Sequence, residues 1–334
     1  EEFIFLEGAQ PESNQYHLSY LAFDPYLKIV CYGDTTHLIY DNGNTEVLED
    51  NFYSVLETLL DKYRIAMNPE ERFYCGILGY IGYECVQFLE KIDFSLPREI
   101  GGPLAELMIP RSLIVFDNNT SVATVVRNVF QEEALAAPRT VYEREKAEIE
   151  SLLNKLQSPL EDTLEVIKQP KTLPLDKFSS NMDKETYLQA VLKCKEYIKK
   201  GHIFQVQVSQ RLKRKLTADP FSLYRFLRYS NPSPFLFFLK LSDIQLIGSS
   251  PEILVGVDDD QVTIRPLAGT RRRYSDKQTE QEISDELLSD EKEGAEHIML
   301  VDLARNDVGR ATERGTVQVT ELMEIEKYQH VIHI

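Results

Sequence analysis

The stretch DEKEGAEHIMLVDLARNDVGR, from Asp290 to Arg310, is the most informative part of this sequence. Read as a helix, it places Glu293 and Glu296 on one face, because side chains three residues apart are helical neighbours. Such a pair suits half of a Mg²⁺ site, since this ion usually takes one or two protein carboxylates and leaves its other positions to water and substrate. The alternative is a solvated acidic helix, because residues 275–293 are acidic throughout. The residues after Glu296 favour the metal site, because their apolar side chains predict a buried helix, in which a charge needs a partner. These apolar residues are Ile298, Met299, Leu300, Val301 and Leu303.

The composition describes a globular chain that can bury a large core. Its 334 residues are 43% hydrophobic, which suits one large domain or two ordinary ones. The net charge of −17 argues against nucleic-acid binding, which needs a basic surface. No apolar run reaches membrane-spanning length. The four cysteines lack Cys-x-x-Cys spacing, which indicates free thiols in a reducing compartment. We therefore expect a cytoplasmic protein, although the chain begins without methionine and a removed targeting segment stays open.

Mixed strand and helix patterns occupy the first part of the chain. The apolar runs Tyr16–Phe23, Lys28–Gly33 and Ser121–Phe130 are typical of strands. Apolar residues at helical spacing predict a helix over Asn51–Arg64, and a charged helix is predicted over Glu143–Gln157.

A polar segment with three prolines, residues 158–182, is the predicted linker or exposed excursion. It separates an N-terminal region, residues 1–157, from residues 183–334. The second region opens with a helix for which Asp183 is the predicted N-cap and Gly201 the predicted stop.

The next segment, Ile203–Leu212, reads as a strand with an uncharged polar face. Alternation places Gln205, Gln207, Ser209 and Arg211 opposite the apolar residues. An ordinary strand with one wet side is the simpler interpretation. Amides that point inward would instead position a polar substrate without supplying a strong base.

Two motifs lie beyond a helix predicted over residues 219–227. Glu252 follows Ser-Ser-Pro at the start of a strand, where a carboxyl can act as a general acid or can simply be a surface group. The strand in 264–274 ends in Ala-Gly-Thr and three arginines. Small residues let backbone amides approach a ligand, and the arginines suit either a ligand or structural ion pairs.

Taken together, these motifs resemble the chorismate-utilising enzymes, and most closely the component I family of anthranilate synthases, over nearly the whole chain. The motifs are FLEG (5–8), GILGYIGYE (76–84), GHIFQVQVSQR (201–211), NPSPFLFF (231–238), GSSPE (248–252), RPLAGTR (265–271), EHIMLVDLARND (296–307) and YQHVIH (328–333). The last five, in this order and spacing, are highly specific. The resemblance implies an α+β fold of two large, mostly antiparallel sheets packed as a sandwich with helices outside.

The resemblance also implies ligands and residue roles. Chorismate and Mg²⁺ are the implied ligands, and Glu293 and Glu296 match the metal-binding glutamates. Glu252 matches the acid that assists departure of the C4 hydroxyl, and His333 matches the histidine that removes the C2 proton. Gly269 and Thr270 match the Gly-Thr pair that contacts the substrate. The resemblance implies the conversion of chorismate and ammonia to anthranilate and pyruvate via 2-amino-2-deoxyisochorismate, which is the first step of tryptophan biosynthesis. It also implies that a glutamine amidotransferase supplies the ammonia within a hetero-oligomer.

Two positions distinguish the reactions within this family. Isochorismate and salicylate synthases carry a lysine base where this chain has Gln205, and an amide cannot deprotonate water. Aminodeoxychorismate synthases typically carry a lysine nucleophile where this chain has Ala268, which cannot form a covalent intermediate. These residues favour anthranilate synthesis. An atypical aminodeoxychorismate synthase component I and a non-catalytic chorismate-binding homologue stay open.

The chain departs from the family in its expected tryptophan site and at its end. That site comprises the residues Glu7, Gly8, Asn231, Pro232, Ser233, Pro234 and Phe235. Gly8 replaces a serine and Phe235 a tyrosine, so two hydroxyls are lost and we expect weakened tryptophan inhibition. The chain also stops at Ile334 inside a motif, so we expect the family's C-terminal segment, with further metal-binding and substrate-binding residues, to be absent from this sequence.

Overall fold

The computed structural model describes residues 2–8, 18–64, 74–92, 94, 98, 100–159, 177–258, 260–274 and 276–334. The chain divides into two compact units. The larger unit consists of Glu1–Asp162 and Tyr224–Ile334, and the smaller unit of Thr163–Leu223. The predicted domain division at 158–182 stays a prediction, because most of that segment lies outside the described residues.

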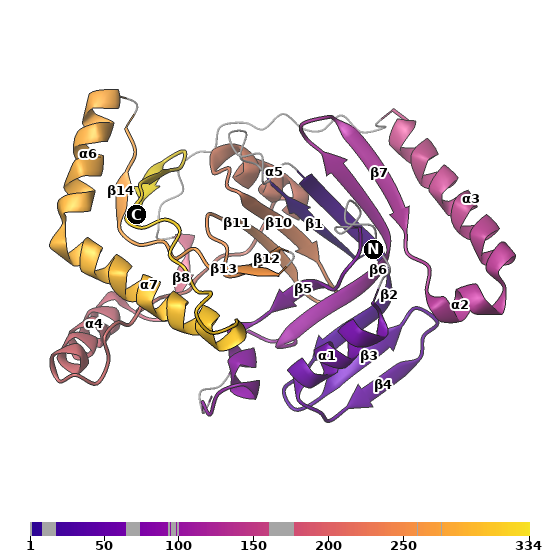
Figure 1. The fold of residues 1–334 in the computed structure, drawn as a ribbon, viewed down its shortest axis with the longest axis horizontal. Helices are drawn as coiled ribbons and strands as arrows, with labels where there is room; N and C mark the ends of the chain where they lie inside the picture. The colour runs from indigo at the N-terminus through magenta and orange to yellow at the C-terminus, as the bar shows by residue number, and fades with distance from the viewer. Residues whose placement is uncertain are drawn as a thin grey trace. The chain divides into compact units, whose positions relative to one another are not determined.

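A nine-stranded antiparallel sheet is the main element of the larger unit (Figure 1). Its central path runs β11-β10-β1-β2-β3-β4, and β6 pairs with β2, β5 and β7. The strands are β1 (Phe3–Glu7), β2 (Leu18–Cys31), β3 (Thr36–Tyr40), β4 (Thr45–Leu48), β5 (Leu78–Ile81), β6 (Ala105–Asp117), β7 (Val122–Arg127), β10 (Phe235–Lys240) and β11 (Gln245–Ser250). The first strand of the chain therefore lies between β2 and a strand more than two hundred residues later.

Strand β2 joins two predicted runs into one long strand. The residues between the runs include Asp24, which has a positive φ of 56°, and the pairing with β6 shifts register between Pro25 and Leu27. Such a bulge bends a strand without ending it. The third predicted run also forms a strand, β7, which ends at Arg127 rather than Phe130.

Helix α1 (Phe52–Lys62) covers part of the sheet through a single apolar face. Asn51 caps it by accepting a hydrogen bond from the Tyr53 amide. Phe52, Val55 and Leu59 are buried in the core cluster that also contains Ile29 of β2. The helix predicted over Asn51–Arg64 is thus confirmed. A 3₁₀ helix, η2 (Tyr83–Phe88), lies further along the chain.

Buried ion pairs attach helices α2 (Gln131–Ala136) and α3 (Pro138–Gln157) to the sheet. Arg111 of β6 donates to Glu133 Oε2 at 3.1 Å, and Arg127 of β7 donates to Glu145 Oε2 at 2.7 Å. Both arginines are buried, so their charges need these partners. The charged helix predicted over Glu143–Gln157 is confirmed and begins five residues earlier, with Pro138 at its first turn.

A three-stranded antiparallel sheet and two helices form the C-terminal part of the larger unit. The sheet order is β14 (Thr270–Arg272), β16 (Val331–His333), β15 (Glu326–Lys327). Helices α6 (Lys277–Ser289) and α7 (Glu291–Ala311) precede β15. Leu287 of α6 forms a small buried core with Ile332 of β16 and Ile334. A separate hairpin consists of β12 (Gly256–Asp258) and β13 (Gln261–Thr263).

The smaller unit contains α4 (Lys184–Lys199) and a short ladder of β8 (Ser179–Ser180) with β9 (Leu212–Lys213). Asp183 caps α4 by accepting from the Thr186 amide, and Gly201 follows with a φ of 72°, in the left-handed region that favours glycine. Both helix-boundary predictions are confirmed. Helix α5 (Pro220–Ser230) begins in this unit and continues in the larger one.

The strand predicted over Ile203–Leu212 is wrong, because residues 203–211 are not in a strand and Phe204 is 92% exposed. A strand needs a neighbour for its amides and carbonyls, and among the described residues β8 pairs with Leu212–Lys213 of β9 and not with residues 203–211. The buried helix predicted after Glu296 is also wrong. Ile298 and Leu303 are about half exposed whereas His297 is buried, so the described residues cover only part of the apolar surface of α7.

Candidate active site

The three-stranded sheet places three functional side chains in one row. Thr270 on β14 lies directly opposite His333 on β16, and Glu326 on β15 lies opposite His333 from the other side. Residues directly opposite in an antiparallel pair project from the same face. The sheet therefore presents a hydroxyl, an imidazole and a carboxylate side by side.

The His333 ring is held through its Nδ1 atom. Nδ1 lies 3.2 Å from the Gly269 carbonyl oxygen and 3.0 Å from Thr270 Oγ1. A carbonyl oxygen only accepts hydrogen bonds, so the contact with Gly269 favours a proton on Nδ1. That tautomer leaves the lone pair on Nε2, which is the form a general base needs.

Gly269 is the point where this sheet approaches helix α7. Its φ of 56° lies in the left-handed region, which favours glycine. A Cβ there would lie 3.0 Å from Leu287 Cδ1, 3.3 Å from Ile334 Cδ1 and 3.4 Å from Glu293 Cβ. The absence of a side chain thus lets the Gly-Thr segment lie beside the predicted metal-binding helix. Ala268, the preceding residue, is buried and exchanges both backbone hydrogen bonds with Ile334.

Glu293 and Glu296 lie one turn apart near the start of α7, as predicted. Asp290 caps this helix by accepting from the amides of Lys292 and Glu293. Lys292 Nζ lies 3.4 Å from Glu293 Oε1 and 3.8 Å from Glu296 Oε2, so both carboxylates face a common cation. Oxygen donors at this spacing fit two of the ligands of a hydrated Mg²⁺ ion. Among the described residues, no group of three or more His, Cys, Asp or Glu side chains has the geometry of a metal site.

Arg271 joins β14 to the ends of both helices. Its guanidinium donates to Glu286 at 3.0 Å and to Asp290 at 3.0 Å, and it lies 3.7 Å from Glu293 Oε1. The hydrogen bond to Glu286 is the main cause that raises the pKa of Arg271. The sequence left open whether the arginines of this segment bind a ligand or form structural ion pairs. In the structure Arg271 forms ion pairs.

Glu252 lies just after β11 and is exposed. Its Oε1 accepts a hydrogen bond from the Leu267 amide at 3.1 Å, which ties the GSSPE segment to the RPLAGTR segment. Because Ala268 in turn bonds to Ile334, a continuous hydrogen-bonded path links Glu252 to the strand that carries His333. The structure thus brings Glu252, Gly269, Thr270, Glu293 and His333 into one region of the larger unit.

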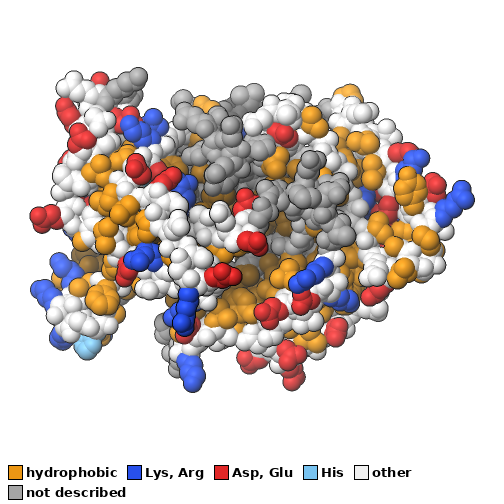
Figure 2. Space-filling model, in the orientation of Figure 1, with side chains coloured by type: hydrophobic (Ala, Val, Ile, Leu, Met, Phe, Trp, Pro, Cys, Tyr) orange, Lys and Arg blue, Asp and Glu red, His pale blue; other side chains and the backbone are white. Residues whose placement is uncertain are grey.

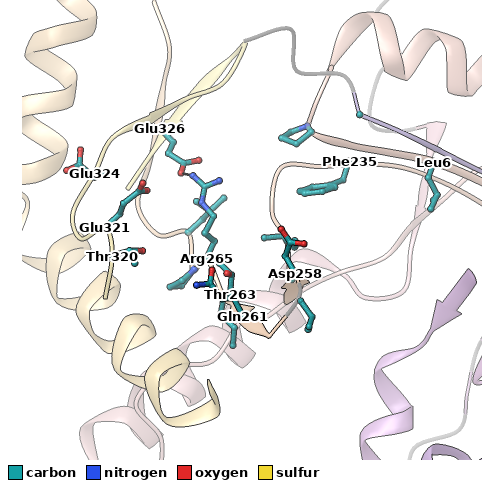
Figure 3. A pocket seen from close by; sticks show the side chains of 18 of the residues that line it. Leu6, Phe235, Asp258, Gln261, Thr263, Arg265, Thr320, Glu321, Glu324 and Glu326 are labelled. Carbon is teal, nitrogen blue, oxygen red and sulfur yellow. Dashed lines mark hydrogen bonds and ion pairs between the residues drawn. The ribbon is translucent and has the colours of Figure 1, made fainter. Parts of the chain in front are cut away.

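A cavity of about 1110 Å³ adjoins this region. Its lining includes Leu267 and Ile334, which are neighbours of the predicted site residues, and also Arg265 and Glu326. Figure 3 shows Arg265 extending toward Glu326 on one side of the cavity, with Phe235 and Leu6 on another. In the space-filling view, acidic side chains are spread over the visible face (Figure 2), in agreement with the net charge of −17.

The predicted tryptophan site residues lie around the junction of β1 and β10. Glu7 is buried and accepts from the Tyr224 hydroxyl at 2.6 Å and from Arg228 Nε at 2.8 Å. Burial is the first cause that raises the pKa of Tyr224. Ser233 is also buried, and its Oγ has no hydrogen-bond partner among the described residues.

Of the other members of this predicted site, Pro234 is buried, Gly8, Pro232 and Phe235 are partly buried, and Asn231 is exposed. Gly8 and Phe235 line the cavity together with Pro234. The Asn231 carbonyl oxygen accepts from Ser249 Oγ at 2.6 Å, and Pro232 is half-buried beside it.

Gln205 belongs to the smaller unit, and its side chain is exposed. The inward-facing amide row that the sequence suggested is not formed, because the segment is not a strand. The placement of Gln205 against the substrate stays a prediction.

The sequence alone did not identify three residues of this region as members of the site. Arg265 and Glu326 form an ion pair, and Glu326 Oε2 accepts from the Tyr328 hydroxyl at 2.6 Å. Tyr328 begins the YQHVIH motif, and Arg265 begins RPLAGTR. Their membership in two specific motifs was the available signal, but only the folded chain brings them together.

Comparisons with known proteins agree with this geometry. The model of the family described as chorismate binding enzyme matches residues 1–334. Anthranilate synthase component 1 of Pseudomonas putida is 40% identical over 284 residues, which cover 84% of this chain and 56% of the relative. The Acetivibrio thermocellus protein of the same name is 35% identical over 334 residues, which cover 99% of this chain and 67% of the relative.

A solved structure shows the same fold. Anthranilate synthase component I from Streptococcus pneumoniae TIGR4 aligns with a TM-score of 0.78 at 30% sequence identity, covering 97% of this chain and 70% of that one. The predicted α+β class with mostly antiparallel sheets is thereby confirmed. The chain spans 56% of the length of the Pseudomonas relative and 67% of the Acetivibrio relative. Every helix that the structure describes is too short or too polar to cross a membrane.

Proposed function

Because the chain belongs to the chorismate-binding enzymes, we propose that it is part of an anthranilate synthase component I, a lyase that converts chorismate and ammonia into anthranilate, pyruvate and water. The observation that carries the proposal is the pairing of Thr270 with His333 beside Gly269 and Glu293. The names and identities of the relatives support the same reaction.

The proposed reaction has two steps. Ammonia attacks C2 of chorismate, a C2–N bond forms, and the C4 hydroxyl leaves as water with a proton from Glu252. The product of this step is 2-amino-2-deoxyisochorismate. His333 Nε2 then removes the C2 proton while the C3–O ether bond breaks and the ring becomes aromatic. The methylene carbon of the departing enolpyruvyl group gains a proton, so the group leaves as pyruvate and the number of protons balances. The Nδ1 contact with the Gly269 carbonyl supports this role, because it leaves Nε2 unprotonated.

Glu293 and Glu296 would hold Mg²⁺, which when bound supplies positive charge for the ring carboxylate of chorismate. Gly269 and Thr270 would contact the substrate through backbone and hydroxyl groups. Ala268 and Gln205 support ammonia as the nucleophile, because neither residue can attack the ring or activate water.

We also infer a cytoplasmic hetero-oligomer in which a glutamine amidotransferase supplies ammonia. The names of the relatives, which denote one component of a synthase, support a second component. Co-expression with a candidate amidotransferase and size-exclusion chromatography would test this assembly, and glutamine-dependent activity would appear only with the partner.

The proposed tryptophan site should bind its ligand weakly. Gly8 and Phe235 line the cavity without the hydroxyls expected at these positions, and Glu7 is already engaged by Tyr224 and Arg228. Isothermal titration calorimetry measures the affinity directly, and tight tryptophan binding would refute this part of the proposal.

The activity is tested by incubating the full-length gene product with chorismate, Mg²⁺ and ammonium at alkaline pH. Anthranilate is detected by its fluorescence and identified by mass and retention time. Aminodeoxychorismate as the product would assign the chain to the 4-aminobenzoate branch instead, despite Ala268. If the folded protein binds chorismate without turnover, a non-catalytic homologue replaces the proposed enzyme.

A further inference from the structure

Glu326 lies where three segments with proposed catalytic residues meet. These are the segment that ends in Pro251 and Glu252, the segment from Arg265 to Thr270, and the segment from Tyr328 to His333. Each contributes an atom to one small network, and the carboxylate of Glu326 is at its centre.

Both carboxylate oxygens of Glu326 have a donor. Oε1 pairs with Arg265 Nη2, and Oε2 accepts from the Tyr328 hydroxyl at 2.6 Å. Figure 3 shows Arg265 and Glu326 pointing toward each other at the cavity. The side chain of Glu326 is 24% exposed, so these charge-assisted contacts are partly protected from water.

Tyr328 connects Glu326 to His333, because its hydroxyl contacts Glu326 and its ring contacts the His333 ring. Their ring centroids are 5.4 Å apart with planes at 72°, an edge-on contact. The Tyr328 hydroxyl also lies 3.3 Å from the Pro251 carbonyl oxygen. Since a phenol has a single hydrogen, the shorter contact with Glu326 takes it. Glu326 thus fixes the phenol, and the phenol fixes one side of the His333 ring.

We infer that Glu326 and Tyr328, assisted by Arg265, are positioning residues for the C2 proton transfer, an inference that rests on the proposed function. Thr270 and Gly269 hold the Nδ1 atom of His333, and Tyr328 supports the ring from another direction. Loss of this support lets the ring move, and small displacements of a base slow proton transfer strongly. We expect chorismate binding to change little, because the proposed substrate and metal contacts belong to other residues, Gly269, Thr270, Glu293 and Glu296.

The first variant is Tyr328→Phe, which keeps the ring and removes the hydroxyl. We expect kcat for anthranilate to fall about tenfold while KM for chorismate changes less than about twofold. Tyr274→Phe is the matched control, because Tyr274 is exposed and lies outside this network. Equal kcat values for Tyr328→Phe and the wild type would overturn the inference.

The primary isotope effect on kcat, measured with chorismate deuterated at C2, distinguishes a positioning role from a purely structural role. If the base is displaced, C2 proton removal becomes slower relative to the other steps, so the primary isotope effect on kcat is larger in Tyr328→Phe than in the wild type. The isotope effect does not depend on the folded fraction, so it stays readable if the variant is less stable. An unchanged isotope effect would overturn the inference.

Glu326→Gln and the double variant complete the test. Because both side chains act through one hydrogen bond, the double variant should lose little more activity than either single variant. Multiplicative losses would show that the two residues act independently and would contradict the network. If the wild type makes no anthranilate, the proposed function itself fails, whereas an active wild type with fully active variants rejects only the inference.

Discussion

Replacement of Gly269 by alanine tests the close approach between the Gly-Thr segment and helix α7. The new Cβ would lie 3.0 Å from Leu287 Cδ1 and 3.4 Å from Glu293 Cβ, at a residue whose φ is 56°. Leu287 is fully buried and packs against Ile332, so its side chain has little room to move. The substitution therefore adds a steric contact to a backbone penalty.

The two penalties are separable by a control. An L-residue in the left-handed region costs about 1–2 kcal/mol, and the reduced entropy of the unfolded chain returns about 0.4–1 kcal/mol. Overpacking against Leu287 adds about 1–3 kcal/mol. Gly315 has φ 86° and nothing within 4 Å of its ideal Cβ, so Gly315→Ala carries only the backbone part. We expect about 2–4 kcal/mol for Gly269→Ala and about 1 kcal/mol for Gly315→Ala.

Urea unfolding of both variants, followed by circular dichroism, measures these differences. Steady-state kinetics should show a second effect of Gly269→Ala, because a shift of Glu293 disturbs the proposed Mg²⁺ site and raises the Mg²⁺ concentration needed for half-maximal activity. Equal stability of the two variants would refute the steric argument, since the backbone penalty is common to both.

Three further substitutions give distinct outcomes. Thr270→Val keeps the shape of the side chain but removes the 3.0 Å contact with His333, so kcat/KM should fall about tenfold in the anthranilate assay; full activity would count against this contact. The hydrogen bond from Arg111 lowers the pKa of Glu133, so this carboxylate stabilises the fold above its unfolded pKa and the stabilisation is lost as the pH falls. Urea unfolding between pH 7 and pH 4 should therefore show a shallower loss of stability in Glu133→Gln, and parallel curves would contradict the assignment. Arg271→Met leaves three carboxylates without their shared cation, so the melting temperature should fall, and the deficit should shrink in 1 M NaCl because salt screens their repulsion; a deficit independent of salt would contradict the electrostatic account.

Local signals in the sequence predicted the helices well. Asn51 and Asp183 cap α1 and α4 where the sequence placed the helix starts, because a side chain that accepts from nearby amides acts within a few residues. The segment 203–211 illustrates the opposite case. Its alternation suits a strand, but strand formation depends on a neighbour from elsewhere in the chain, and alternation says nothing about that neighbour.

The candidate site likewise contains residues that local sequence patterns indicate and residues that only the folded chain brings together. The spacing of Glu293 and Glu296 on a helix was readable from the sequence, and the structure has both on α7. The roles of Thr270 and His333 came from resemblance to a family, and their opposition on β14 and β16 needed the folded sheet. Glu326 carried no local signal, because its partners Arg265 and Tyr328 meet it only through tertiary contacts.

The place of β1 between β2 and β10 has a consequence for synthesis of the protein. Residues Phe3–Glu7 leave the ribosome before the two strands that flank them, and Leu236–Lys240 must be made before the second edge of β1 is covered. Until then the nascent chain exposes an unpaired strand edge, which can pair with other chains. The nine-stranded sheet therefore cannot be completed in the order of translation, and an N-terminal half expressed alone would retain an open, aggregation-prone edge.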